Sequence, residues 1–204
     1  MVTEIRLYVE GGGDRSDGRA LIREGFGDFL DSARRLARRR RIRWSVTACG
    51  GRNAAFDAFK DALESHPEAF IVLLVDSESP VTGNPWEHLR TRDQWDPPGV
   101  PDEHCHLMVQ MVEAWLVADP DVLAKYYGQG FHRNSLPRRD DVEAIPKDQL
   151  LQSLGRATAD TKKKGYAKIR HCADLLGLLN QDRVRQRAHH CDLLFKTLEA
   201  RLRE

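Results

Sequence analysis

The chain has 204 residues, of which 41% are hydrophobic and 31% are charged, and its formal net charge is +1. This length suits one domain with a small appendage, and the near-neutral charge excludes a protein-wide positive field, so any surface for nucleic acid has to be a local patch. No apolar run approaches the length of a membrane span, and the N-terminal residues lack a signal-peptide pattern, which predicts a cytoplasmic protein.

The first 75 residues alternate between predicted strands and helices. The short apolar segment 5–9 and the continuous apolar run 70–75 indicate strands, and the unbroken run is typical of a central strand that is buried on both faces. The spacing of apolar residues predicts helices over 17–40 and 53–64. Between these helices, apolar and polar residues alternate over 42–48, which indicates a half-buried strand at the edge of a sheet.

Residues 79–103 contain five prolines, two glycines and two tryptophans, and this composition predicts a long loop. Its tryptophans, Trp86 and Trp95, could stack on bases or anchor the loop to the domain, and we favour the second interpretation. Residues 106–111 indicate another strand. A helical pattern follows, restarted by Asp119 as an N-cap residue with a proline at the first helical position.

After residue 140 the pattern is entirely helical, and an apolar stripe recurs every three or four residues from Val184 to Leu202. This stripe could be a partner surface. The alternation of strands and helices predicts an α/β fold with a mainly parallel sheet flanked by helices and a C-terminal helical extension. We divide the chain into an α/β domain, residues 1–135, and a helical extension, residues 136–204.

Carboxylates follow three of the predicted strands within three residues: they are Glu10, the pair Asp76 and Glu78, and Glu113. If the strands are parallel, these acids emerge at the carboxyl edge of the sheet, where open α/β folds bind their ligands. Carboxylates in such a cluster repel one another unless a cation lies between them, and Mg²⁺ or Mn²⁺ suits a few carboxylates together with water and phosphate. Asp14 is a weaker candidate ligand.

Three glycines follow Glu10, and they allow the backbone to approach a metal ion or phosphate because no Cβ is in the way. Acids also end strands simply because strands end at the surface, and we favour that explanation for any one acid alone but a metal site for the set. The P-loop, dinucleotide, GxSxG and HExxH motifs are absent from the sequence, which disfavours nucleotide-cofactor enzymes and serine hydrolases.

The four cysteines are scattered without a CxxC motif, and disulfides are not expected. A zinc site that combines Cys105 and His106 with residues 189–191 is a minor alternative, because the spacing matches no standard zinc module. Small buried thiols and surface imidazoles are the favoured interpretation of these residues.

Basic residues form two local clusters. We interpret the arginine-rich segment 34–43 as a solvated helix face, since it is expected at the opposite edge of the sheet from the acids. The segment 161–171 combines positive charge with an aromatic side chain and a glycine, and we weigh phosphate contact and a solvated loop equally. Its candidate nucleic-acid-binding residues are Lys164, Tyr166, Lys168 and His171.

The segments "YVEGGGD" and "LVDSE" resemble the Toprim pattern, in which one strand ends in Glu-Gly and a later strand ends in Asp-x-Asp. Glu10 matches the first acid, and Asp76 and Glu78 match the acid pair, with glutamate in place of the usual second aspartate. The whole chain, including "HLMVQMVEAWLVADP", "YYGQGF" and "KKGYAKIRH", resembles a Toprim-like bacterial family of unknown function. Members of that family often lie beside ABC-type ATPase genes in phage-defence loci.

The resemblance implies a Toprim-like, Rossmann-like fold over about residues 4–120 and a divalent-metal-dependent nuclease akin to the overcoming-lysogenization-defect type. Such an enzyme would hydrolyse DNA or RNA as the antiviral effector beside an ABC-type ATPase. Asp76 and Glu78 would be ligands, Glu10 a ligand or general base, and Glu113 a further ligand. A catalytically inactive module that binds or regulates the ATPase and a small-molecule phosphatase are the alternatives. The oligomeric state and the choice among DNA, RNA and tRNA stay open.

Overall fold

The computed structural model describes residues 2–204 and contains a sheet of four strands in which every neighbouring pair is parallel. The strand order across this sheet is β2-β1-β3-β4. The strands are β1 (Glu4–Val9), β2 (Arg43–Ala48), β3 (Phe70–Asp76) and β4 (Cys105–Met108). The predicted α/β class with a mainly parallel sheet is confirmed, and β2 lies at an edge of the sheet as its alternating pattern predicted.

All seven residues of β3 are buried, as expected for a central strand of a sheet covered on both faces. Successive side chains of a strand point to opposite faces, so β3 contributes to two separate apolar clusters. Its Phe70, Val72 and Leu74 join one cluster. Its Ile71, Leu73 and Val75 join the other cluster.

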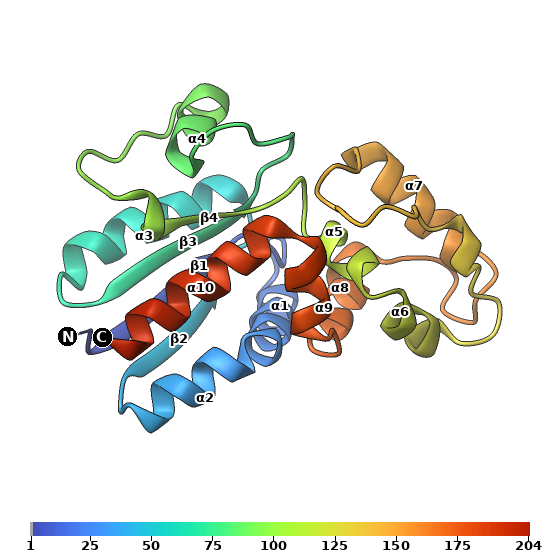
Figure 1. Cartoon of the computed structure of the whole chain (residues 1–204), viewed down its shortest axis with the longest axis horizontal. Helices are drawn as coiled ribbons and strands as arrows, with labels where there is room; N and C mark the ends of the chain where they lie inside the picture. The colour runs from blue at the N-terminus through green and yellow to red at the C-terminus, as the bar shows by residue number, and fades with distance from the viewer. Residues whose placement is uncertain (1) are drawn as a thin grey trace.

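Helices cover both faces of the sheet (Figure 1). The cluster of Ile71 is closed by α3 (Arg52–Ser65) and α4 (Pro85–Asp93). The cluster of Phe70 is closed by α1 (Ser16–Phe29), α2 (Asp31–Arg39) and α10 (His189–Arg203). The start of β1 and the end of α10 lie close together in Figure 1, at the edge of the sheet opposite the carboxyl ends of β1 and β3.

The remaining helices follow β4 and lie beyond the carboxyl ends of the strands (Figure 1). They are α5 (Glu113–Ala118), α6 (Pro120–Tyr127), α7 (Lys147–Thr158), α8 (Lys168–Leu176) and α9 (Gln181–Arg187), with short 3₁₀ turns over Asp102–His104 and Arg133–Ser135. Asp119 caps α6 through its side chain, as predicted, by accepting a hydrogen bond from the amide of Val122.

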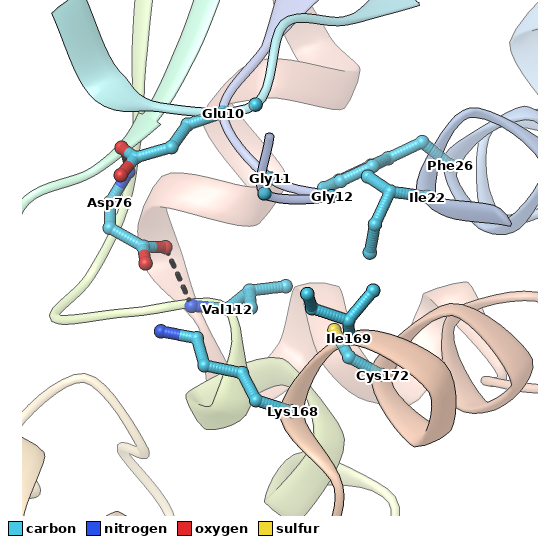
Figure 2. Close-up of a pocket in the computed structure, with 12 residues that line it drawn as sticks. Glu10, Gly11, Gly12, Ile22, Phe26, Asp76, Val112, Lys168, Ile169 and Cys172 are labelled. Carbon is cyan, nitrogen blue, oxygen red and sulfur yellow. Dashed lines mark hydrogen bonds between the residues drawn. The ribbon is translucent and has the colours of Figure 1, made fainter. Parts of the chain in front are cut away.

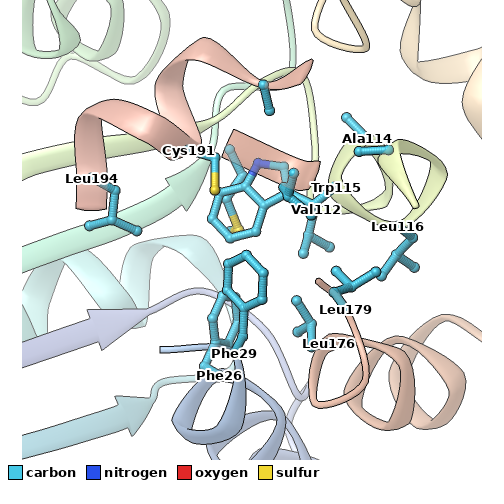
Figure 3. Close-up of a cluster of buried hydrophobic side chains, with 14 of the residues drawn as sticks. Phe26, Phe29, Val112, Ala114, Trp115, Leu116, Leu176, Leu179, Cys191 and Leu194 are labelled. Atoms are coloured by element: carbon cyan, nitrogen blue, oxygen red, sulfur yellow. The ribbon is translucent and has the colours of Figure 1, made fainter. Parts of the chain in front are cut away.

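Trp115 of α5 joins the early and late parts of the chain in one core (Figure 3). Its ring centroid lies 5.3 Å from that of Phe29 and 6.3 Å from that of Phe26, both in α1. Leu176 of α8 and Cys191 of α10 belong to the same cluster. The apolar core therefore continues across residue 135, and the division of the chain into residues 1–135 and 136–204 stays a prediction.

The prediction of one helix over 17–40 is wrong, because the chain forms α1 and α2 with a break at Leu30. Leu30 leaves helical geometry with φ −92° and ψ 15°, and its side chain is fully buried. The change of direction at this residue allows buried side chains of both helices to face the same side of the sheet.

The prediction of a loop over 79–103 is also wrong, since α4 lies within it. The helix begins where the Asn84 side chain accepts a hydrogen bond of 3.0 Å from the amide of Glu87. The anchoring interpretation of the tryptophans is confirmed. Trp86 donates its Nε1–H to the carbonyl of Pro101 at 3.1 Å, and Trp95 stacks on Phe56 with ring centroids 4.3 Å apart.

Three smaller expectations are settled by the later elements. β4 is shorter than the predicted strand over 106–111, because its ladder pairs only with residues 73–76 of β3. The apolar stripe from Val184 to Leu202 is buried inside the molecule, so it is not a partner surface. All four cysteines are free thiols, and three of them are buried.

Within residues 2–204 there is no helix of the length and apolar character needed to span a membrane.

Candidate metal centre

Glu10 directly follows β1, and both its backbone and its side chain form hydrogen bonds with β3. Its amide donates to the carbonyl of Leu74 at 2.9 Å, and its Oε2 accepts a hydrogen bond of 3.2 Å from the amide of Asp76. Burial raises the pKa of Glu10, and the charge of Arg52 and the Asp76 amide act in the opposite direction. The carboxylate of one strand end is thus fixed to the backbone of the neighbouring strand end.

The chain turns sharply after Glu10, and the turn requires glycine at its centre. Gly12 has φ +92°, and a Cβ placed on it would lie 2.6 Å from Cα of Arg19 in the first turn of α1. Real Cβ atoms do not approach backbone atoms so closely, and L-residues with side chains rarely adopt this conformation. The close approach of the turn to α1 therefore explains the glycines that follow Glu10.

Asp76 ends β3 and is almost completely buried, with 5% of its surface exposed. Its Oδ1 accepts a hydrogen bond of 2.9 Å from the amide of Val112, drawn as the dashed line in Figure 2. Burial raises the pKa of Asp76 well above its ordinary value, and the charges of Glu10 and Glu113 raise it further. A nearby cation would offset both effects.

Glu10, Asp76 and Glu78 form a group in which one carboxylate oxygen from each residue lies within 4.8 Å of the others. Glu78 is brought back toward the sheet edge by its left-handed backbone, with φ 66°, and its amide donates to the carbonyl of Gln110 at 2.7 Å. Its carboxylate is paired with the amino group of Lys147. The structure therefore brings together the three acids that the sequence placed at the ends of β1 and β3.

Glu113 and Asp14 lie outside this group. Glu113 is fully buried at the start of α5, and its Oε1 accepts a hydrogen bond of 2.9 Å from the hydroxyl of Tyr166. Among the described residues its Oε2 is also buried but has no hydrogen-bond partner. Asp14 is exposed in the turn before α1. Glu113 is nevertheless close enough to Asp76 for its negative charge to raise the pKa of Asp76.

The four candidate nucleic-acid-binding residues occupy different environments. Lys168, at the start of α8, lines the cavity beside Glu10 and Asp76, with its amino group on the acidic side (Figure 2). Lys168 is exposed at the cavity rim, and although partial desolvation opposes its charge, the carboxylates of Glu113, Asp76 and Glu78 outweigh that effect and raise its pKa. Lys164 is exposed in the preceding loop. His171 is buried, and its Nδ1 accepts a hydrogen bond of 3.0 Å from the amide of Ala167.

Arg52, the first residue of α3, connects the acids to α4 and was not among the predicted site residues. Its guanidinium donates to Glu10 Oε2 at 3.2 Å, to the carbonyl of Asp76, and to both carboxylate oxygens of Asp93 at 2.8 and 2.6 Å. The guanidinium also lies 5.0 Å from the ring centroid of Trp95. The signal in the sequence was slight, because Arg52 and Asp93 are 41 residues apart.

The minor zinc alternative receives no support from the described residues. The acidic group of Glu10, Asp76 and Glu78 is the one set of three candidate ligand atoms found within 4.8 Å among residues 2–204, and it contains no cysteine or histidine. Burial raises the thiol pKa values of Cys105 and Cys191 well above their ordinary values. Both thiols therefore match the interpretation as small buried side chains. The expectation of a surface imidazole is wrong for His106, because it lies in β4, whose residues are all buried.

Comparison with protein families gives a match over residues 9–199 to the family described as "Domain of unknown function (DUF4276)". The chain belongs to this DUF4276 family. The comparison with curated proteins gives no match. Among solved structures, the chain is similar to the C-terminal region of the Xanthomonas campestris pv. campestris OLD protein, with 15% identity, a TM-score of 0.46, and coverage of 100% of this chain and 99% of the other.

Proposed function

We propose that this DUF4276 protein is a divalent-metal-dependent nuclease that hydrolyses phosphodiester bonds in DNA or RNA. The observation that carries the proposal is the convergence of Glu10, Asp76 and Glu78 within 4.8 Å at the carboxyl edge of a parallel sheet. A bound Mg²⁺ or Mn²⁺ ion would supply Lewis-acid stabilisation of phosphate charge and a lowered pKa for water. Hard divalent cations favour the oxygen ligands that this group offers.

Two further observations support the fit of a cation to these residues. Asp76 is buried beside other acids, so its ionised form needs a positive charge nearby. The Oε2 atom of Glu113 is buried without a partner in the described part of the chain, and an unpartnered carboxylate oxygen is costly unless something binds it. An ion, or a water molecule held by one, would meet both needs.

From these contacts we assign each residue a role in binding the ion, the water or the phosphate. Oε2 of Glu10 accepts hydrogen bonds from Arg52 and from the Asp76 amide, which leaves Oε1 to bind the ion or to accept a proton from water. Asp76 and Glu78 would hold the ion. Glu113, through its free oxygen, would be a further ligand or orient water. The amino group of Lys168 would balance the charge of the substrate phosphate.

The partners in this proposal are nucleic acid and an ABC-type ATPase. The local positive charge of Lys164 and Lys168 supports the first partner. The second partner, and a role as the effector of an anti-phage defence system, come from the resemblance of the sequence to its Toprim-like relatives. Homo-oligomerisation and the cytoplasmic location remain parts of the proposal.

A second candidate function is a catalytically inactive module that binds or regulates the ATPase. The observation in its favour is that Glu10 pairs with Arg52 and Glu78 pairs with Lys147, so internal cations already compensate two of the three acids. An ion would have to displace Lys147 or share Glu78 with it. The two candidates therefore differ in whether divalent ions bind and activate the protein.

A cleavage assay with Mg²⁺ or Mn²⁺ tests the proposal on single-stranded DNA, duplex DNA and structured RNA. We expect Glu10→Gln and Asp76→Asn to lower the rate by at least about 100-fold, the upper end of the loss found for residues that only support ligands. Circular dichroism should report an intact fold, because neither change removes core volume. The matched control is Asp96→Asn, an exposed acid of the α4 region that should leave the rate unchanged.

The two candidates give opposite results in this assay. Full activity in either site variant would refute the site assignment. A wild-type protein that is inert with every divalent ion and every substrate, but binds the ATPase, would support the inactive module instead.

A further inference from the structure

A cavity of about 250 Å³ opens beside the acidic group, between the glycine turn, α1 and α8. Figure 2 shows that it has two unlike halves. Glu10, Asp76 and Lys168 lie on one side, and Ile22, Phe26, Ile169 and Cys172 lie on the other. The proposed nuclease mechanism uses the polar half only, and the apolar half has no part in holding an ion.

The glycine turn is what keeps this apolar half open. A Cβ on Gly13 would lie 3.3 Å from Cδ1 of Ile169, and a Cβ on Gly11 would lie 3.3 Å from Cγ2 of Ile22. Both side chains belong to the apolar lining, so larger residues in the turn would press into the cavity wall. The space therefore depends on two of the three glycines that follow Glu10, namely Gly11 and Gly13.

The size and lining of the cavity restrict what it can hold. Sites for drug-sized ligands span about 300–1,000 Å³, so this cavity takes a smaller group, about one ring system. The floor is apolar and includes the aromatic ring of Phe26, whereas the rim carries carboxylates and an amine. A flat group with an apolar face and a polar edge, attached to a phosphate at the acidic rim, matches both halves.

We propose that the cavity receives one unpaired nucleobase, whose adjoining phosphate lies at Glu10, Asp76 and Lys168. This inference rests on the proposed nuclease function and names its substrate class, namely nucleic acid with an unpaired nucleotide at the cleavage site. A base inside a duplex is paired and stacked and cannot enter a pocket, and unpairing and unstacking it costs a few kcal/mol. Single strands, loops and bulges avoid that cost.

Ile169 provides the means to test the inference without disturbing the acids. It lies in α8 at the cavity wall, and 42% of its surface is exposed, so a larger side chain there can be accommodated by the fold. Ile169→Trp would place its ring in the space that the base needs. The matched control is Leu193→Trp in α10, which has a similar exposure of 38% and does not line the cavity.

The binding experiment uses a single-stranded DNA that carries 2-aminopurine, with Ca²⁺ present in place of Mg²⁺. The emission of 2-aminopurine rises when the base leaves its stacked neighbours. We expect a severalfold rise with wild-type protein and with Leu193→Trp. With Ile169→Trp we expect the rise to be lost and the Kd to increase by at least about tenfold, the equivalent of 1.4 kcal/mol.

A parallel cleavage assay compares single-stranded and fully paired DNA of one sequence in Mg²⁺. We expect faster cleavage of the single strand by wild-type protein, and loss of that preference in Ile169→Trp. No emission change with wild-type protein, or an equal response of Ile169→Trp and Leu193→Trp, would overturn the base pocket even if the protein cleaves DNA. If the protein cleaves neither DNA but the emission response is as expected, the nuclease proposal is overturned and the base pocket is supported.

Discussion

Arg52→Met is the most direct test of how the acidic group is held in place, because Arg52 contacts two of its three residues. The methionine retains the length and apolar character of the side chain and removes the guanidinium. The change leaves Asp93, with 11% of its side chain exposed, with Arg92 on Oδ1 and no partner for Oδ2. It also leaves Oε2 of Glu10 without its positive partner.

The expected cost follows from burial. Removing one member of a buried ion pair costs about 3–5 kcal/mol, because the other charge remains buried and unpaired. Arg52 and Asp93 keep 14% and 11% exposure of their side chains, and Arg92 still pairs with Asp93 after the change, so we expect the lower end of this range, about 3 kcal/mol of unfolding free energy. In a double-mutant cycle with Asp93→Asn, we expect a coupling of about 2 kcal/mol.

The assay is urea denaturation at pH 7 in EDTA, so that bound ions do not contribute to stability. The matched control is Arg90→Met, because Arg90 and Asp96 form a pair of nearly equal length, 2.7 Å against 2.6 Å, whose side chains are 57% and 56% exposed. Water already solvates that pair, and its loss should leave stability nearly unchanged. Equal effects of the two changes would refute the argument from burial, and so would a cost below about 1 kcal/mol for Arg52→Met.

Two other predictions concern the glycine turn and the sheet. Gly12→Ala should lower the unfolding free energy by about 3 kcal/mol, because Gly12 has a positive φ and the added Cβ would meet backbone atoms of Arg19. The control Gly51→Ala, with φ −73° and no atom within 4 Å of its Cβ, should change the unfolding free energy by less than about 1 kcal/mol. Similar melting curves for the two variants would contradict this difference. Burial lowers the pKa of His106 to about 4 from an ordinary 6.5, so its contribution to stability is complete above pH 6.5 and is lost as the pH falls toward 4. Between pH 7 and 4.5, urea denaturation should show that wild type loses about 2–3 kcal/mol more unfolding free energy than His106→Gln. The control is His189→Gln, because His189 is exposed and its replacement should leave the wild-type loss unchanged. Equal losses in all three proteins would contradict the role of His106.

The convergence of the acids could be predicted from the sequence because it follows from topology alone. Once β1 and β3 are parallel neighbours, the residues at their carboxyl ends must lie at one edge of the sheet. Glu10 and Asp76 are those residues, and the structure places their carboxylates together. The position of Glu78 could not be predicted from topology alone, since its side chain reaches the group only through a left-handed backbone conformation.

Other features depended on partners far apart in the sequence. The pair of Arg52 and Asp93 exists because α3 and α4 pack on the same face of the sheet, and no local pattern specifies that contact. The helix α4 itself did have a local signal, because Asn84 and Pro85 form an N-cap with proline at the first helical position. The prolines and glycines that surround this cap outweighed it in a composition-based prediction.

The charges around the acidic group indicate how many ions it needs. Arg52 pairs with both Glu10 and Asp93, and Arg92 also pairs with Asp93. The charged groups at and next to the site are therefore five carboxylates and four cations, namely those of Glu10, Asp76, Glu78, Glu113, Asp93, Arg52, Arg92, Lys147 and Lys168. When all nine are ionised, one negative charge remains, and one divalent cation exceeds it by one positive charge. The phosphate of a bound substrate is the group that would balance this excess, and a second ion would need further negative charge from elsewhere.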